Sequence, residues 1–131
     1  MIATTIKQSA HLLKLGLPKE TADMHYYWEI VKTPGSSGEF EPFLGVGPTV
    51  KDSNVPAWSV GRLMEMLPAR INGAYLDSSN LHITKNGEEW EVFYCNHDEQ
   101  ISSRNKSLIN AVYGMMRELL VKGKLNLEGV K

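Results

Sequence analysis

The sequence has little cysteine and no long apolar run. Its 131 residues include a single cysteine, Cys95, so no intramolecular disulfide can form, which is typical of a reducing compartment. No window approaches the ~18 consecutive apolar residues of a membrane-spanning helix. The first residues, MIATTIKQSAHLLK, lack the apolar core and the cleavage site of a signal peptide. We therefore expect a cytoplasmic protein without a membrane partner.

The sequence also lacks an excess of charge of either sign. Fourteen basic residues (14 Lys+Arg) stand against 15 acidic ones, for a net charge of -1. Nucleic-acid-binding proteins usually carry a basic excess or a basic stripe, whereas here the nearest approach to a cluster is Arg104 with Lys106 and Lys122 with Lys124. This balance favours a protein partner or self-association. A nucleic-acid-associated protein remains the alternative, since a local basic patch can form on a neutral protein.

No catalytic signature is present either. The stretch CNHDEQ brings Cys95, His97, Asp98 and Glu99 together, but no second pair of ligands follows at the spacing of a zinc site. The segment GVGPTVK lacks the G-K-[ST] ending of a phosphate-binding loop. We therefore assign no catalytic, cofactor-binding or metal-ligating residue. A small enzyme that uses residues 95–99 is the least favoured hypothesis.

What is present is the composition of one globular domain spanning residues 1–131, with 42% hydrophobic and 22% charged residues. Helical spacing of apolar residues predicts helices over 5–15 and 105–122, which Gly16 and Gly123 would end. PKETADM predicts a short helix that Pro18 opens. The tail, residues 124–131, either docks through its leucines or frays.

The segment PAWSVGRLMEMLP predicts a further helix over residues 56–68. Proline suits the first turn, Ser53 or Asn54 can cap it, and Pro68 would close it. Its apolar residues fall at i, i+3, i+4 and i+7, which is the pattern of a core helix. A functional role would instead require exposure of Trp58 or Arg62.

Residues 70–95 predict an antiparallel meander of three strands: RINGAYL, LHITK and EEWEVFYC. Asn86-Gly87 is a strong hairpin signal, and a two-residue turn there would pair Lys85 with Glu88 and Ile83 with Trp90, which gives one apolar face. Helices and strands are segregated along the chain, so we predict an α+β fold in which the meander packs against helices in two layers. An N-terminal strand can extend this sheet.

That N-terminal strand is HYYWEIVK, residues 25–32, and its alternation places Tyr26, Trp28 and Ile30 on one face. Residues 33–55, rich in glycine and proline, predict an irregular loop region whose only strand would be an edge strand. The aromatic residues of both segments form our candidate interaction surface: Tyr26, Tyr27, Trp28, Phe40 and Phe43. The competing interpretation, which the sequence favours, is that these rings pack beneath the loop of residues 33–55.

Several segments together resemble a known group of proteins. They are KQSAHLLKLGLPKETADMHYYW, then PAWSVGRLMEMLP, then a strand that carries a tryptophan, then SLINAVYGMMRELLVKGKL. The chain resembles small uncharacterised proteins encoded in prophages and other mobile elements of gut bacteria, and the last helix after a meander is similar to small α/β sandwich domains of phage proteins. The resemblance implies a genetic setting and transfers no activity, cofactor or site residue. The leading hypothesis is a non-catalytic accessory or interaction protein of such an element.

Overall fold

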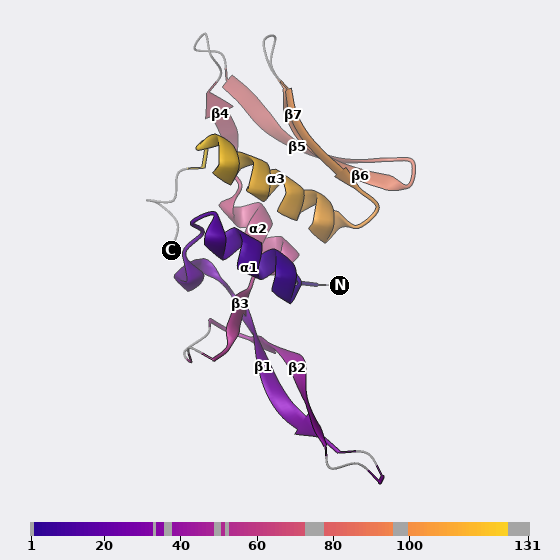
Figure 1. Ribbon diagram of the computed structural model, residues 1–131. Coiled ribbons are helices and arrows are strands. Elements are labelled where there is room, and N and C mark those ends of the chain that lie inside the picture. The colour runs from indigo at the N-terminus through magenta and orange to yellow at the C-terminus, as the bar shows by residue number, and fades with distance from the viewer. Residues whose placement is uncertain are drawn as a thin grey trace.

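The computed structural model describes residues 2–125, apart from 33, 36–37, 49–50, 52, 73–77 and 96–99. Two antiparallel sheets have the strand orders β2-β1-β3 and β4-β5-β6-β7. With the helices they confirm the predicted α+β class (Figure 1). The elements in chain order are α1 (Ile6–Lys14), the 3-10 helix η1 (Lys19–Thr21), β1 (Met24–Val31), β2 (Glu39–Val46), β3 (Val55–Ala57), α2 (Val60–Met66), β4 (Arg70–Asn72), β5 (Ser78–Asn86), β6 (Glu89–Cys95), β7 (Gln100–Asn105) and α3 (Leu108–Lys122).

The main core lies between the four-stranded sheet and the helices. Alternate residues of β6 and β7, among them Val92, Tyr94 and Ile101, are buried on the face that meets α3. Figure 1 shows α3 against the sheet, with α2 and α1 farther from it. A close approach of α3 to β7 requires Gly114, because a Cβ there would overlap Ser103 Oγ. Burying apolar side chains on one face of the sheet is the main stabilising contribution of this layer.

The meander has four strands where the sequence predicted three. The unpredicted strand is β7, QISSRN, which pairs with β6 over its whole length. Ile101 is its one large apolar residue, so the strand gave no hydrophobic alternation. The helix expected from residue 105 begins instead at Leu108. Of the predicted strand RINGAYL, the structure shows β4, and residues 73–77 lie outside the described residues.

The β5–β6 hairpin has the predicted faces but a different register. Asn86 pairs with Glu89 and Ile83 with Val92, so the predicted Lys85–Glu88 and Ile83–Trp90 pairs are wrong by two residues. Gly87, with φ of 67°, stands in the turn itself. A shift of two residues preserves the alternation of side chains, which is why the apolar face was still predicted correctly.

Two predicted helices are shorter than expected. The segment PKETADM forms only the 3-10 helix η1, because Met24 already begins strand β1. The helix predicted over residues 56–68 is α2, Val60–Met66, and its N-cap is Ser59, whose hydroxyl accepts from Arg62 N. Pro56 lies in β3, opposite His25. In contrast, α1 and the end of α3 at Gly123, which has the left-handed backbone, agree with the sequence.

The segment 33–55 contains an edge strand, as the sequence allowed, but this strand is regular and eight residues long, so the segment is not irregular throughout. Residues Glu39–Val46 form β2, which pairs with β1 from Met24↔Val46 to Val31↔Glu39. These strands form a sheet of their own with β3 and do not extend the meander. In the tail, Leu125 packs against the main core, and residues 126–131 lie outside the described residues.

Trp58 joins this second sheet to the helical body. Its side chain is fully buried, and its indole Nε1–H donates to Thr21 Oγ1 at 2.9 Å. Its backbone N–H donates to Thr4 Oγ1 at 3.1 Å, and its carbonyl accepts from Thr4 N at 2.9 Å. Nearby, Arg62 Nε donates to the Thr21 carbonyl at 2.8 Å. Trp58 and Arg62 therefore act in the packing of this junction, as the core interpretation of the segment predicted.

Removing the acceptor of the indole should destabilise the protein. We expect Thr21→Val to lower the free energy of unfolding by about 1–3 kcal/mol, because the buried indole N–H and the Pro18 carbonyl both lose a partner. Urea unfolding measures this value. In a Trp58→Phe background the same change should cost less; an equal cost in both backgrounds would show that the indole bond contributes nothing.

Tyr94 should make stability depend on alkaline pH. Its hydroxyl donates to the Pro68 carbonyl at 2.5 Å, and burial raises its pKa well above the ordinary value of 10.0. Above about pH 10 the unfolded chain loses this proton while the folded chain keeps it, so stability falls as the pH rises. We expect Tyr94→Phe to be less stable at pH 7 by about 1–2 kcal/mol.

The pH dependence provides the check on this residue. In urea unfolding between pH 7 and pH 11, the difference between wild type and Tyr94→Phe should narrow above about pH 10. A difference that stays constant over this range would contradict the raised pKa.

Candidate functional site

Strands β1 and β2 form an arm that extends from the body of the protein. Figure 1 shows the two strands running away from the helices and from the four-stranded sheet. Strand β3 pairs with β1 only from Met24 to Tyr26. Beyond Tyr26, β1 has β2 as its only strand partner among the described residues. We call residues 24–46 the arm.

One face of the arm is apolar at every position. Residues directly opposite each other in an antiparallel pair share a face, so the register places four pairs on this side: Met24↔Val46, Tyr26↔Leu44, Trp28↔Pro42 and Ile30↔Phe40. Much of this apolar face is exposed, with 70% of Phe40, 53% of Ile30, 37% of Trp28 and 86% of Val46 accessible. Exposed apolar residues that are contiguous in this way mark interaction sites more often than scattered ones do.

The base of the apolar face is packed. Tyr26 and Leu44 contact a small cluster of Ala3, Met24 and Ala57. The Tyr26 hydroxyl donates to the Thr4 carbonyl at 2.7 Å, and burial raises the Tyr26 pKa above its ordinary value. Tyr26 therefore anchors the arm to the N-terminal segment, and the exposed part of the face consists of Trp28, Ile30 and Phe40 farther out and of Val46 beside the base.

The opposite face carries aromatic rings near the base. Tyr27 lies 5.9 Å from Phe43 and 5.9 Å from His25, measured between ring centroids. His25 Nδ1 is 2.9 Å from the Gly47 carbonyl. Gly45, opposite His25, leaves room for these rings, since a Cβ there would lie 2.9 Å from His25 Nε2. The contacts among these rings stiffen the arm where it leaves the body.

Farther out, this opposite face is acidic. Glu29 and Glu41 lie directly opposite each other, and the next pair is Val31↔Glu39. Like charges in directly opposed positions are destabilising. None of these glutamates takes part in an ion pair of the described residues. The arm thus has an apolar face and, on the other side, three glutamates that form no ion pair among the described residues.

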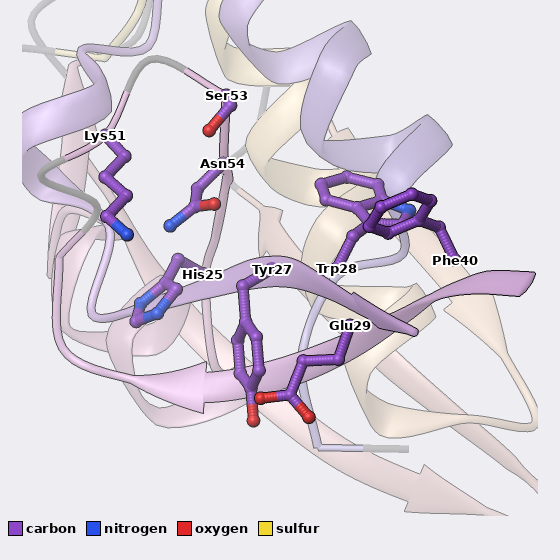
Figure 2. Close-up of a pocket in the computed structure, with 8 residues that line it drawn as sticks. All are labelled: His25, Tyr27, Trp28, Glu29, Phe40, Lys51, Ser53 and Asn54. Atoms are coloured by element: carbon purple, nitrogen blue, oxygen red, sulfur yellow. The ribbon is translucent and has the colours of Figure 1, made fainter. Parts of the chain in front are cut away.

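A pocket of ≈ 730 Å³ lies beside the part of β1 that no longer pairs with β3. It is lined by β1 residues and Phe40 on one side and by Lys51, Ser53 and Asn54 on the other (Figure 2). Figure 2 shows Trp28 and Phe40 on one side of the arm and Tyr27 and Glu29 on the other. The lining combines three aromatic rings, Tyr27, Trp28 and Phe40, with five polar residues.

The structure divides the five predicted aromatic residues between two faces. Trp28 and Phe40 lie exposed on the apolar face, while Tyr27 and Phe43 stack on the opposite one and Tyr26 is anchored at the base. The described part of residues 33–55 does not cover Phe40 and Trp28, which are 70% and 37% exposed, and Glu39–Val46 form the partner strand β2. Sequence reasoning missed Pro42 and Val46, although the alternation of FEPFLGV contained the signal.

The polar stretch at residues 95–99 contributes no described site. Cys95 is exposed at the end of β6, and residues 96–99, which include His97, Asp98 and Glu99, lie outside the described residues. In the part of the chain that the structure describes, no three His, Cys, Asp or Glu side chains gather into a group that could hold a metal ion.

No helix within the described ranges combines the length and the apolar character needed to cross a membrane. Comparison with protein-family models, with curated proteins and with solved structures gave no match. Functional inference therefore rests on the geometry of the arm.

The two ends of the apolar face should respond differently to substitution. We expect Phe40→Thr to change the free energy of unfolding by no more than about 0.5 kcal/mol, because the ring is mostly exposed and threonine suits a strand. Tyr26→Phe should cost about 1 kcal/mol, since it removes the hydrogen bond to Thr4. Urea unfolding measures both, and a large loss in Phe40→Thr would mean that the ring is part of the core.

Proposed function

We propose that this protein is a non-catalytic interaction protein that binds a protein partner through the apolar face of its arm. The observation that supports this most strongly is the exposure of Phe40, Ile30 and Trp28 on one continuous face of a projecting hairpin. A face that served only folding would be covered. The resemblance of the sequence to phage and mobile-element proteins supports an accessory role in such an element.

The exposed area is in the range expected for the centre of an interface. Aromatic side chains carry ~150–250 Å² each, and the exposed fractions of Phe40 and Trp28, together with those of Ile30 and Val46, imply roughly 400 Å² of apolar surface. A standard interface buries about 800 Å² on each partner. The apolar face can therefore form the core of a specific interface, surrounded by a polar rim.

The charge of the arm argues against nucleic acid as the partner at this surface. Glu29, Glu39 and Glu41 line the face opposite the apolar one, and phosphate groups would be repelled there. A protein partner can offer apolar side chains to one face and basic side chains to the other.

The decisive experiment is affinity capture from a lysate of the natural host, with and without nuclease. We expect the wild type to retain a stoichiometric protein in both cases, and the double variant Ile30→Thr/Phe40→Thr to lose it while remaining folded. Val121→Thr, on the exposed side of α3, is the matched control because it also removes an exposed apolar side chain. Capture that survives in the arm variant, or that nuclease abolishes, would overturn the proposal.

A further inference from the structure

The arm exposes a backbone edge on β1, and hydrogen-bond alternation identifies the groups along it. Gly47 N donates to the Asp23 carbonyl at 2.8 Å, one step beyond the Met24↔Val46 pair. Hydrogen-bonded and non-hydrogen-bonded pairs alternate along an antiparallel ladder. The N–H and C=O groups of β1 residues 24, 26, 28 and 30 therefore point away from β2.

Strand β3 occupies only the first half of that edge. Met24 and Tyr26 face β3, which begins at Val55 opposite Tyr26. Trp28 and Ile30 lie beyond it, so no described strand pairs with their outward N–H and C=O groups. The pocket lies beside this part of β1 (Figure 2).

The other two edges of the same sheet are interrupted by proline. Pro42 pairs with Trp28 at a non-hydrogen-bonded position, so its nitrogen faces away from β1 and leaves the outer edge of β2 without a donor there. Pro56, opposite His25, has the same orientation on β3. Proline on an edge strand prevents the addition of another strand. Only the edge at Trp28 and Ile30 lacks this protection among the described strands of this sheet.

We propose that the edge of β1 at Trp28 and Ile30 takes up an extended segment of a partner protein as an additional strand. The inference rests on the proposed function and specifies how the partner is bound. Backbone hydrogen bonds to an open edge supply affinity, and the alternating side chains supply specificity. The side chains of the added strand on one face join Trp28, Ile30 and Phe40, which selects apolar residues.

Charge selects basic residues on the other face. Between residues 24 and 46 the chain contains three glutamates and one lysine, and Glu29 and Glu41 stand opposed. A lysine or arginine of the added strand beside Glu29 relieves this repulsion. Figure 2 shows Lys51 beside His25, while Glu29 lies farther along β1. The segment therefore alternates apolar and basic residues.

The same charges disfavour a second copy of this chain as the occupant. A continuous sheet formed by two β1 edges keeps equivalent faces on the same side. Glu29 and Glu41 of both copies would then crowd one face, which is destabilising. A basic partner avoids this arrangement.

The test uses the full-length protein labelled with ¹⁵N and a nine-residue peptide that alternates valine and lysine. We expect binding to slow hydrogen exchange of the Trp28 and Ile30 backbone amides at least about tenfold, because these amides become hydrogen-bonded. A peptide that alternates valine and glutamate should not bind. N-methylation of the peptide amides that face β1 should abolish binding. N-methylation of the amides on the opposite edge of the peptide should preserve it.

Variants separate charge from general stickiness. Glu29→Gln/Glu41→Gln should weaken binding of the lysine peptide several-fold, whereas Glu88→Gln, in the exposed turn of the β5–β6 hairpin, should leave it unchanged. Equal losses in both, or binding of the glutamate peptide, would overturn the charge preference.

The remaining outcomes distinguish this inference from the proposed function. Strand addition is overturned if the peptide binds without protecting the two amides, or if it does not bind at millimolar concentration. Capture from the lysate is a separate test, and it decides whether the apolar face binds a protein. Amide protection in the protein alone that rises with its concentration, with sedimentation as a dimer, would identify a second copy as the occupant.

Discussion

The buried indole of Trp58 donates its N–H to Thr21 Oγ1. The backbone N–H of Trp58 donates to Thr4 Oγ1, and its carbonyl accepts from Thr4 N. The three segments that meet there are the N-terminal residues before α1, the 3-10 helix η1, and the step from β3 into α2. Moving these segments apart would leave the buried indole N–H without an acceptor, at a cost of about 1–3 kcal/mol. This cost holds the segments in place relative to one another. The direction in which the arm leaves the body depends on this junction.

The junction also explains why the arm can remain uncovered. Helix α3 buries its apolar side against the four-stranded sheet, and α1 and α2 add residues to the same core. Among the described residues, a small cluster of apolar side chains supports the base of the other sheet. Rigidity at the base comes from polar contacts, among them the bond of Tyr26 to Thr4 and the two bonds of Ser59 to Asp23. Beyond Tyr26, the described apolar side chains of the arm that are mostly exposed are Ile30 and Phe40, on the face that carries Trp28.

Much of the fold follows from local patterns, and the errors have identifiable causes. The alternation of β1 and the faces of the β5–β6 hairpin were predictable because side-chain period is a local property. Strand β7 was not, because its residues are mostly polar and its pairing depends on β6. The strand character of residues 39–46 was obscured by Pro42, which is compatible with a strand only because its nitrogen faces an open edge.

For the candidate site, the sequence by itself determined the kinds of side chain available: aromatic and apolar residues in alternation, with glutamates between them. It also determined where α1 and α3 end, since Gly16 and Gly123 adopt the positive φ that stops a helix locally. Tertiary structure decided which face of the arm would be exposed and which backbone edge would be open. Both depend on where β3 stops beside β1 and on which sheet the helices cover, and long-range packing sets these features.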